Sequence, residues 1–254
     1  MRLLAASVFI IAATSPALAQ STVIAENLPY PAQYDPISGR DLQDGTFSDA
    51  FQSGGNYFYS QAIGQSFSIA SGQTPTITDI TFWGSSEYQQ SNTPWNQTVL
   101  SSNIVGMQIA IFRTDRGTPN FPLVTSWTIQ TGQFSQVLTG NYTPETFSPV
   151  LKLSSDLAGN FMLSSGSYMI TIGGVLNNPD GDAFAWTDGL ADGSIPATQA
   201  YATVGDIPTE WGTWIPIPDG TSGAFILGGT TVPAPGAIAL LGMAGLRTRR
   251  RRTM

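Results

Sequence analysis

The stretch TPTITDITFWGSS, residues 74–86, alternates between two sets of side chains along its whole length. In an extended chain, successive side chains point to opposite faces. One face would carry Ile77, Asp79, Thr81 and Trp83. The other face would carry Thr76, Thr78, Ile80 and Phe82. A period of two that is rich in β-branched and aromatic residues is typical of a β-strand.

Similar runs follow one another through the chain, separated by turn residues such as Gly, Pro, Ser, Asn and Asp. Examples are QAIGQSFSIA at 61–70, IVGMQIAIFRTD at 104–115 and GSYMITIGGV at 166–175. Between the two chain ends, no stretch keeps a helical period over three turns. We therefore expect about eleven to thirteen strands in one all-β domain, a β-sandwich of jelly-roll type.

The segments that flank this domain have a different composition. Residues 20–56 hold three prolines and scattered acids, and they lack long periodic runs. We expect an extended lead-in there, with the compact domain beginning near Phe47 or Tyr57 and spanning residues 57–230. The run GGTTVPAPG at 228–236 is expected to be a linker after the last strand.

The first nineteen residues have the three parts of a secretory signal peptide. Arg2 is positive, residues 3–13 are apolar, and Ala17-Leu18-Ala19 supplies a small-x-small cleavage site. We expect a signal helix that the Sec translocon recognises and signal peptidase removes, so that the mature chain begins near Gln20.

The run VPAPGAIALLGMAGLRTRRRR, residues 232–252, joins a Pro-Ala-Pro motif, a short apolar segment and five arginines. The apolar segment 234–246 has thirteen residues, whereas a helix needs about 20 to cross a bilayer. Clustered arginines keep a chain end on the cytoplasmic side. This order of parts predicts transient membrane association through a short apolar helix rather than a permanent span.

This tripartite tail resembles a PEP-CTERM sorting signal of Gram-negative bacteria. The motif position is occupied by Val232, Pro233, Ala234, Pro235 and Gly236, and Ala234 stands where the family has Glu. The basic cluster comprises Arg247, Arg249, Arg250, Arg251 and Arg252. The resemblance implies processing by an exosortase, a membrane transpeptidase-like protease, and delivery to the cell surface or the extracellular matrix.

The strand pair at 74–86 and 104–115 is also similar to strand pairs in exported bacterial β-sandwich domains. The similarity rests on the Trp83-Gly84 strand end and on a turn that contains Arg113, Asp115, Gly117 and Pro119. It implies a fold and no activity.

Charge and composition exclude several classes of function. Between the two signals the chain has 17 acidic residues and only four basic ones, Arg40, Arg113, Arg116 and Lys152, for a net charge of −13. Such acidity argues against nucleic acid as a partner, because phosphate binding needs Lys and Arg. Cys and His are both absent, which excludes disulfides, Ser-His-Asp triads and His-ligated zinc. We expect no catalytic residues and no enzymatic activity.

Two alternatives involve carbohydrates. Exposed aromatic rings beside carboxylates often mark binding sites, and the predicted glycan-binding residues are Glu87, Tyr88, Trp95 and Trp211. A glycoside hydrolase would need two carboxylates about 5–10 Å apart across a cleft. Glu87 and Glu210 are the candidate carboxylates for this role, although no paired motif is present.

The run NNPDGDAFAWTDGLADG at 177–193 is rich in the oxygen ligands that calcium prefers. Asp180, Asp182 and Asp188 are the predicted ligands, and calcium is the only cofactor that the sequence suggests. An EF-hand does not fit, because Ala183 stands where that loop needs Gly. Plain turn formation explains the same Asp and Asn residues equally well.

Together these features predict an exported protein of the cell surface or matrix of a Gram-negative bacterium. Its expected role is structural or adhesive, in a polysaccharide or biofilm layer. The expected partners are the Sec translocon, signal peptidase, an exosortase and extracellular polysaccharide. Carbohydrate binding is the alternative function, and carboxylate-based glycoside hydrolysis is the less favoured one.

Overall fold

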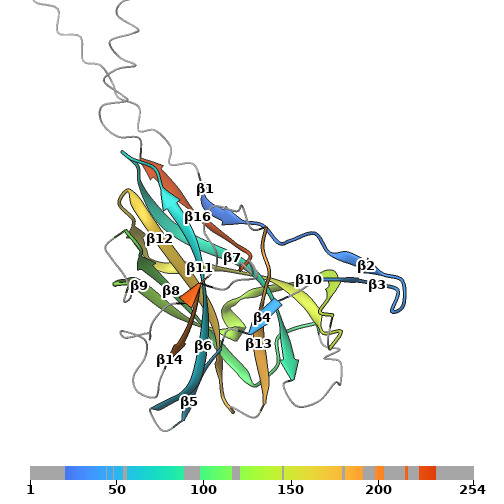
Figure 1. Ribbon diagram of the computed structural model, residues 1–254. Coiled ribbons are helices and arrows are strands. Elements are labelled where there is room, and N and C mark those ends of the chain that lie inside the picture. Colours follow the sequence, from blue (N-terminus) through green and yellow to red (C-terminus); the bar gives the residue numbers. More distant parts are fainter. Residues whose placement is uncertain are drawn as a thin grey trace, which may run out of the picture.

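The fold is built from strands. The computed structural model describes residues 21–43, 45–47, 49–53, 56–88, 98–115, 121–144, 146–178, 181–190, 198–202, 215–216 and 223–232. These residues form sixteen strands and one short 3₁₀ helix, η1 (Thr131–Gln133), and no α-helix (Figure 1). The all-β prediction is therefore confirmed, although the strands are more numerous than expected.

The first sheet has nine strands. Seven of them follow the order β1 (Ser21–Asn27), β16 (Phe225–Val232), β7 (Thr74–Tyr88), β11 (Pro149–Met162), β10 (Ser135–Tyr142), β3 (Arg40–Leu42) and β2 (Gln33–Asp35). The far end of β7 also pairs with β13 (Asp182–Thr187), which pairs in turn with β4 (Gly45–Phe47).

The second sheet has seven strands. Their order is β15 (Ile215–Pro216), β14 (Thr198–Ala202), β6 (Asn56–Ile69), β5 (Asp49–Ser53), β12 (Gly166–Leu176), β8 (Ile104–Arg113) and β9 (Leu123–Gln130). β6 and β12 also pair directly with each other.

Buried side chains from both sheets form one hydrophobic cluster. Ile80 and Phe82 enter it from β7, and Ile170 enters it from β12. The rings of Phe67 on β6 and Phe225 on β16 meet edge to face, with their centroids 6.1 Å apart. These two rings belong to different sheets, so the cluster that excludes water contains side chains from both sheets.

Strand β7 departs from the strict alternation that its sequence predicts. Ile77, Ile80 and Phe82 are all fully buried, although Ile77 was assigned to the opposite face. The register shifts at this point, because Gly228 pairs with Asp79 whereas Gly229 pairs with Ile77. The extra residue, Thr78, is a β-bulge, and a bulge moves every side chain beyond it to the other face.

The predicted lead-in belongs to the fold, so the expected start near Phe47 or Tyr57 is wrong. β1 pairs along its length with β16, where Ser21 is opposite Thr230. Residues 21–53 supply five strands in all. Three of these strands are only three residues long, which is too short to show a periodic pattern.

The predicted linker at 228–236 also starts inside a strand. β16 continues through Gly228 and Gly229 to Val232, which is opposite Thr74 of β7. A Cβ at Gly228 would overlap the Asp79 carboxylate, and a Cβ at Gly229 would overlap the backbone carbonyl of Thr76. These glycines therefore mark a close approach within the sheet and not a flexible connection.

Both predicted terminal helices lie outside the described residues, which begin at Ser21 and end at Val232. Within the described part of the chain, no helix has the length and apolar character needed to span a bilayer.

Candidate functional site

The outer face of the first sheet carries a series of polar residues along β7 and β11. Three outward-facing residues of β7 are directly opposite three of β11. We call these pairs the polar ladder, and they are Asp79 with Asp156, Thr81 with Ser154, and Trp83 with Lys152. The inward-facing neighbours Ile80, Phe82 and Leu153 are fully buried. The ladder is thus the polar side of two strands whose apolar side fills the core.

A groove of about 390 Å³ opens over two pairs of this ladder. It is lined by Asp79, Ile80, Thr81, Gln133, Ser135, Ser154, Ser155 and Asp156. All but one of these side chains carry hydrogen-bonding oxygen or nitrogen atoms. We call it the ladder groove, and it is the candidate functional site.

Two acidic residues occupy directly opposite positions on neighbouring strands at the ladder groove. Asp79 and Asp156 are directly opposite across the antiparallel strands, which places their Cβ atoms about 5 Å apart. Asp79 accepts a hydrogen bond of 2.8 Å from the Thr78 hydroxyl. Within the described residues, neither carboxylate forms an ion pair. Like charges in this position repel each other, so the ladder groove favours a ligand that brings hydrogen-bond donors or a positive charge.

The rest of the ladder supplies hydroxyl groups and an aromatic ring. The hydroxyls of Thr81 and Ser154 are hydrogen-bonded across the strands at 2.9 Å. The Lys152 ammonium lies 5.8 Å from the centre of the Trp83 ring, within the range of a cation–π contact. Carboxylates, hydroxyls and a nearby indole together suit a ligand that is rich in hydroxyl groups.

Glu87, one of the four predicted glycan-binding residues, is buried. Glu87 lies within β7, is only 6% exposed and accepts a hydrogen bond of 3.1 Å from the Ser85 hydroxyl. Its predicted position in a loop is therefore wrong, because β7 extends to Tyr88, while glycan binding by Glu87 stays a prediction. Tyr88 is the last residue of β7. Trp95, Trp211 and Glu210 lie outside the described residues.

The structure does not bring the predicted calcium ligands together. Asp182 opens β13 and accepts a hydrogen bond of 2.6 Å from the Ser101 hydroxyl. Asp188 comes directly after the end of β13, so an extended strand of about 20 Å separates the two residues. Asp180 lies outside the described residues. Among the residues that the structure describes, no three acidic side chains gather as a metal site would require, and calcium binding stays a prediction.

The three described tryptophans have different environments. Trp186 is a core residue, 1% exposed, and its indole N–H donates to the Ala224 carbonyl at 2.8 Å. Trp127 is partly buried against Phe161, and its N–H donates to the Ala158 carbonyl. Trp83 lies on the polar ladder, in the pair next to Thr81 and Ser154, which line the ladder groove.

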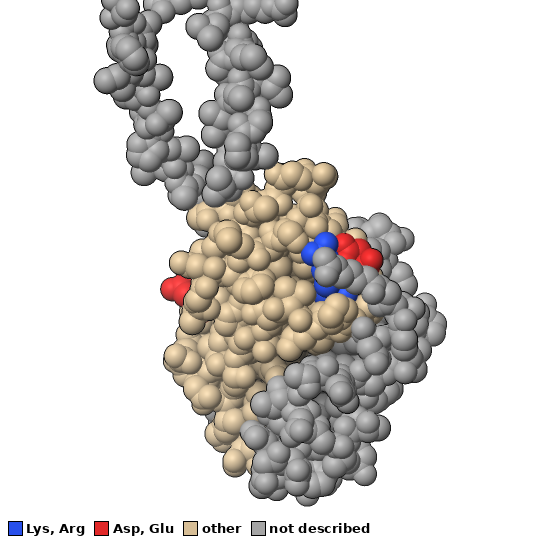
Figure 2. Space-filling model, turned by 90° about the vertical axis from the view of Figure 1, so that its left-hand side faces the viewer, with Lys and Arg blue, Asp and Glu red and all other residues tan. Residues whose placement is uncertain are grey.

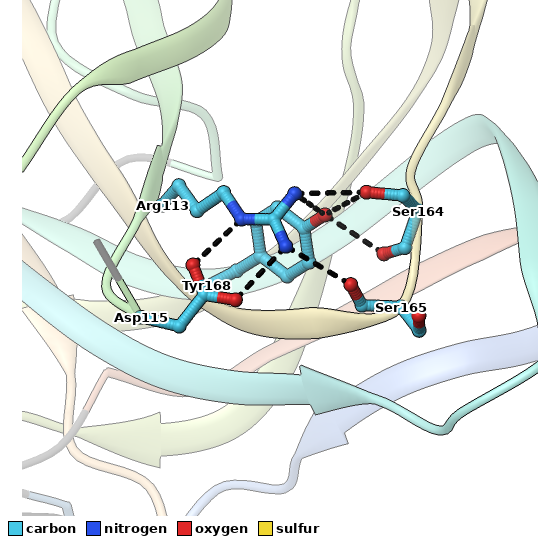
Figure 3. Close-up of polar contacts among 5 residues, drawn as sticks. All are labelled: Arg113, Asp115, Ser164, Ser165 and Tyr168. Atoms are coloured by element: carbon cyan, nitrogen blue, oxygen red, sulfur yellow. Dashed lines mark hydrogen bonds and ion pairs between the residues drawn. The ribbon is translucent and has the colours of Figure 1, made fainter.

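A second polar cluster lies where β8 ends and β12 begins, and we call it the arginine clasp (Figure 3). The Arg113 guanidinium donates to both Asp115 carboxylate oxygens, at 2.6 and 2.9 Å. It also donates to the Ser164 hydroxyl at 2.9 Å and to the Ser165 carbonyl at 3.1 Å. The guanidinium lies over the Tyr168 ring, 5.4 Å from its centre.

The clasp is a structural feature, because its donors are used within the protein. The hydrogen bond to Asp115 raises the pKa of the Arg113 guanidinium above its ordinary value. The contacts to Ser164 and Ser165 attach the turn between β11 and β12 to the end of β8 (Figure 3). Gly117 and Pro119 of the predicted turn lie outside the described residues.

Of the predicted sorting motif, only Val232 is described, as the last residue of β16. Pro233, Ala234, Pro235, Gly236 and the arginine cluster lie outside the described residues. Comparison with known protein families, curated proteins and solved structures returns no match.

Proposed function

We propose that this chain is an exported protein that a C-terminal sorting signal directs to the cell surface or extracellular matrix. Its role there is structural or adhesive, in a polysaccharide or biofilm layer. The observation that carries the proposal is the tail, in which a Pro-Ala-Pro motif, an apolar segment and five arginines follow one another without interruption. An exosortase-type enzyme would process this tail, and the Sec translocon and signal peptidase would act at the other end.

The body fits this role as a jelly-roll-like β-sandwich, which we propose as the finer description of the two packed sheets. Its net charge of −13 keeps such a body soluble outside the cell. The absence of Cys from the sequence makes its stability independent of disulfide formation, so the hydrophobic core has to supply it.

Fractionation of the native host tests the proposal. The full-length protein should appear in the surface or extracellular fraction, whereas a chain that lacks residues 233–254 should remain in the periplasm. A control variant with Gln in place of Arg247, Arg249, Arg250, Arg251 and Arg252 keeps the length and the motif, and it should also fail to reach the surface. If the full-length protein stays in the cytoplasm or periplasm, the proposal is wrong.

Carbohydrate binding is a second candidate function, now supported by the ladder groove instead of the Glu87 region. The groove combines two carboxylates, which form no ion pair within the described part of the chain, with the hydroxyls of Thr81, Ser135 and Ser154, all able to bond sugar hydroxyls. Its negative charge favours a neutral or amino-bearing glycan and disfavours a uronic acid polymer.

Titration of the purified protein with neutral and amino-bearing oligosaccharides tests this candidate. Asp156→Asn should weaken binding about tenfold, since a hydrogen bond to a charged group contributes about 1.5 kcal/mol or more. Asp41→Asn is the control, because it makes the same charge change on β3, away from the groove. Equal affinity in both variants would show that the ladder groove is not the binding site. Release of new reducing ends from the oligosaccharide would favour glycoside hydrolysis instead.

A further inference from the structure

We propose that one end of the body, which we call the terminal pole, rests on the phospholipid bilayer while the sorting tail is held in the membrane. The pole comprises the start of β1, the end of β16, the turn at 70–73 and the turn at 163–165. This inference rests on the proposed sorting function and adds the surface that meets the membrane.

Both described chain ends lie at this pole. Ser21, where β1 begins, is opposite Thr230 on the neighbouring strand. Val232, where β16 ends, is opposite Thr74 of β7. Met162, at the end of β11, is opposite Thr76 of the same strand. Figure 1 shows these strand ends together at the top of the molecule. Before signal peptidase acts, the two segments predicted to contact the membrane therefore leave the body side by side, and afterwards the sorting tail alone does.

The chain between the body and the apolar segment is short. Val232 is held in the β16 ladder, and only residues 233–236 separate it from Ala237. If the chain between them is fully extended, Val232 and Ala237 are at most about 17 Å apart. At the other end, eight residue steps join Ala13 to Ser21, or at most about 27 Å. The headgroup layer of a bilayer is about 5–8 Å thick on each side, so a tail inserted from Ala237 onward keeps the pole at the membrane surface.

The surface of the pole suits this position because it carries little charge. Residues 51–78, 157–179 and 220–246 contain no charged side chain, and these stretches include both turns and the end of β16. Met162 is 68% exposed at the rim. In Figure 2 the surface at this end of the molecule is tan, the colour of uncharged residues.

Among the charged residues that the structure describes, those nearest to the pole are either paired or set back from the rim. Asp115 is paired with Arg113 at 2.6 Å. Asp79 lies three residues beyond Thr76 along β7, about 10 Å from the rim and thus farther than the Debye length of about 8 Å. A bilayer surface rich in anionic lipid repels acidic side chains, so on a body of net charge −13 this pole is well suited to approach it.

The absence of Cys from the sequence makes a labelling test direct. Single-cysteine variants of the full-length chain are labelled with a fluorophore and reconstituted in vesicles of phosphatidylethanolamine and phosphatidylglycerol that contain a headgroup quencher. Met162→Cys and Gln73→Cys place the label on the pole. Val137→Cys is the control, since Val137 is 55% exposed and lies opposite Lys152, about 20 Å from the pole along the sheet. Leu241→Cys reports insertion of the tail.

The expected result is quenching at Met162 and Gln73 that is several-fold stronger than at Val137, together with quenching at Leu241. Flexible Gly-Ser spacers of about 20 residues, placed before Ser21 and after Val232, add about 25 Å of reach. They should lower quenching at Met162 and Gln73 to the level at Val137 and leave Leu241 unchanged.

The outcomes separate the two proposals. If Leu241 is quenched while Met162 and Gln73 behave like Val137, the pole does not face the membrane, and this inference is overturned while tail insertion stands. If Leu241 is not quenched, the tail does not insert, and the proposed sorting function fails together with the inference.

Discussion

The arginine clasp and the ladder groove place carboxylates in opposite situations. Asp115 in the clasp has a guanidinium bonded to both of its oxygens. Asp79 and Asp156 at the groove occupy directly opposite positions on β7 and β11, and neither forms an ion pair within the described residues. The clasp has an internal counter-ion and joins two turns, whereas the groove presents its hydrogen-bonding groups to solvent.

The placement of the described cations explains this difference. Arg40 lies over the Tyr142 ring at 4.6 Å, and Arg113 lies over Tyr168. Lys152 lies over Trp83. Each of these three cations contacts an aromatic ring, and none of them neutralises the groove. Negative charge in the groove is therefore a property of this arrangement, and it is what a ligand with donor groups would encounter.

The largest effect on stability is expected from a substitution at Gly166, whose backbone lies against the arginine clasp. Gly166 has φ +149°, and a Cβ there would come within 2.6 Å of an Arg113 nitrogen. Gly166→Ala should reduce the free energy of unfolding by about 1–3 kcal/mol, lowering the melting temperature by about 2–4 °C per kcal/mol.

Gly72→Ala is the matched control for this prediction. Gly72 also has a positive φ, +78°, but nothing lies within 4 Å of its Cβ position. Gly72→Ala should lower the free energy of unfolding only through backbone strain, by about 1 kcal/mol. Equal losses in thermal unfolding of the two variants would show that the clasp contributes nothing.

A smaller effect on the melting temperature is expected when Arg113 is replaced by Lys and, separately, Lys152 is replaced by Arg. Arg113→Lys removes the planar fork that bonds both oxygens of Asp115, which an ammonium cannot reproduce. It should lower the melting temperature, whereas Lys152→Arg should leave it nearly unchanged because a guanidinium also fits over Trp83. A larger loss of melting temperature for Lys152→Arg than for Arg113→Lys would contradict this difference between the clasp and the polar ladder.

The smallest effect has the opposite sign and concerns the groove. Asp156→Asn removes one of two like charges that face each other, so it should stabilise the protein by about 0.2–1 kcal/mol. After Asp79→Asn the same substitution should no longer stabilise, because the repulsion is already absent. Equal effects in both backgrounds, measured by denaturant unfolding as a double-mutant cycle, would mean that the two carboxylates do not interact.

Local patterns predicted the strands and missed what depends on pairing. The runs predicted as strands at 61–70, 104–115 and 166–175 correspond to β6, β8 and β12, although β8 and β12 are buried on both faces over most of their length. The bulge at Thr78 changed the face of Ile77, and a bulge depends on the partner strand as much as on its own residues. β1 belongs to the sheet through its pairing with β16, some 200 positions away. No pattern within β1 itself indicates this partner.

The same limit applies to the candidate site. Glu87 was expected in a loop because polar residues follow it, but β7 extends past it and buries it. The ladder groove was missed because Asp79 and Asp156 are 77 positions apart and meet only through the register of β7 with β11. The sequence pattern that points to the groove is the alternation at 74–86. It places Asp79 on the same face as Thr81 and Trp83, which indicates a polar outer face.

The intact mass of the protein recovered from the surface of its native host tests the central claim most directly. The account predicts a chain that begins near Gln20 and ends within the motif at 232–236, without Arg247 and the four arginines that follow it. That product would carry the net charge of −13 and end at the terminal pole. A surface protein whose mass includes the complete arginine tail would contradict the claim that the tail is a sorting signal.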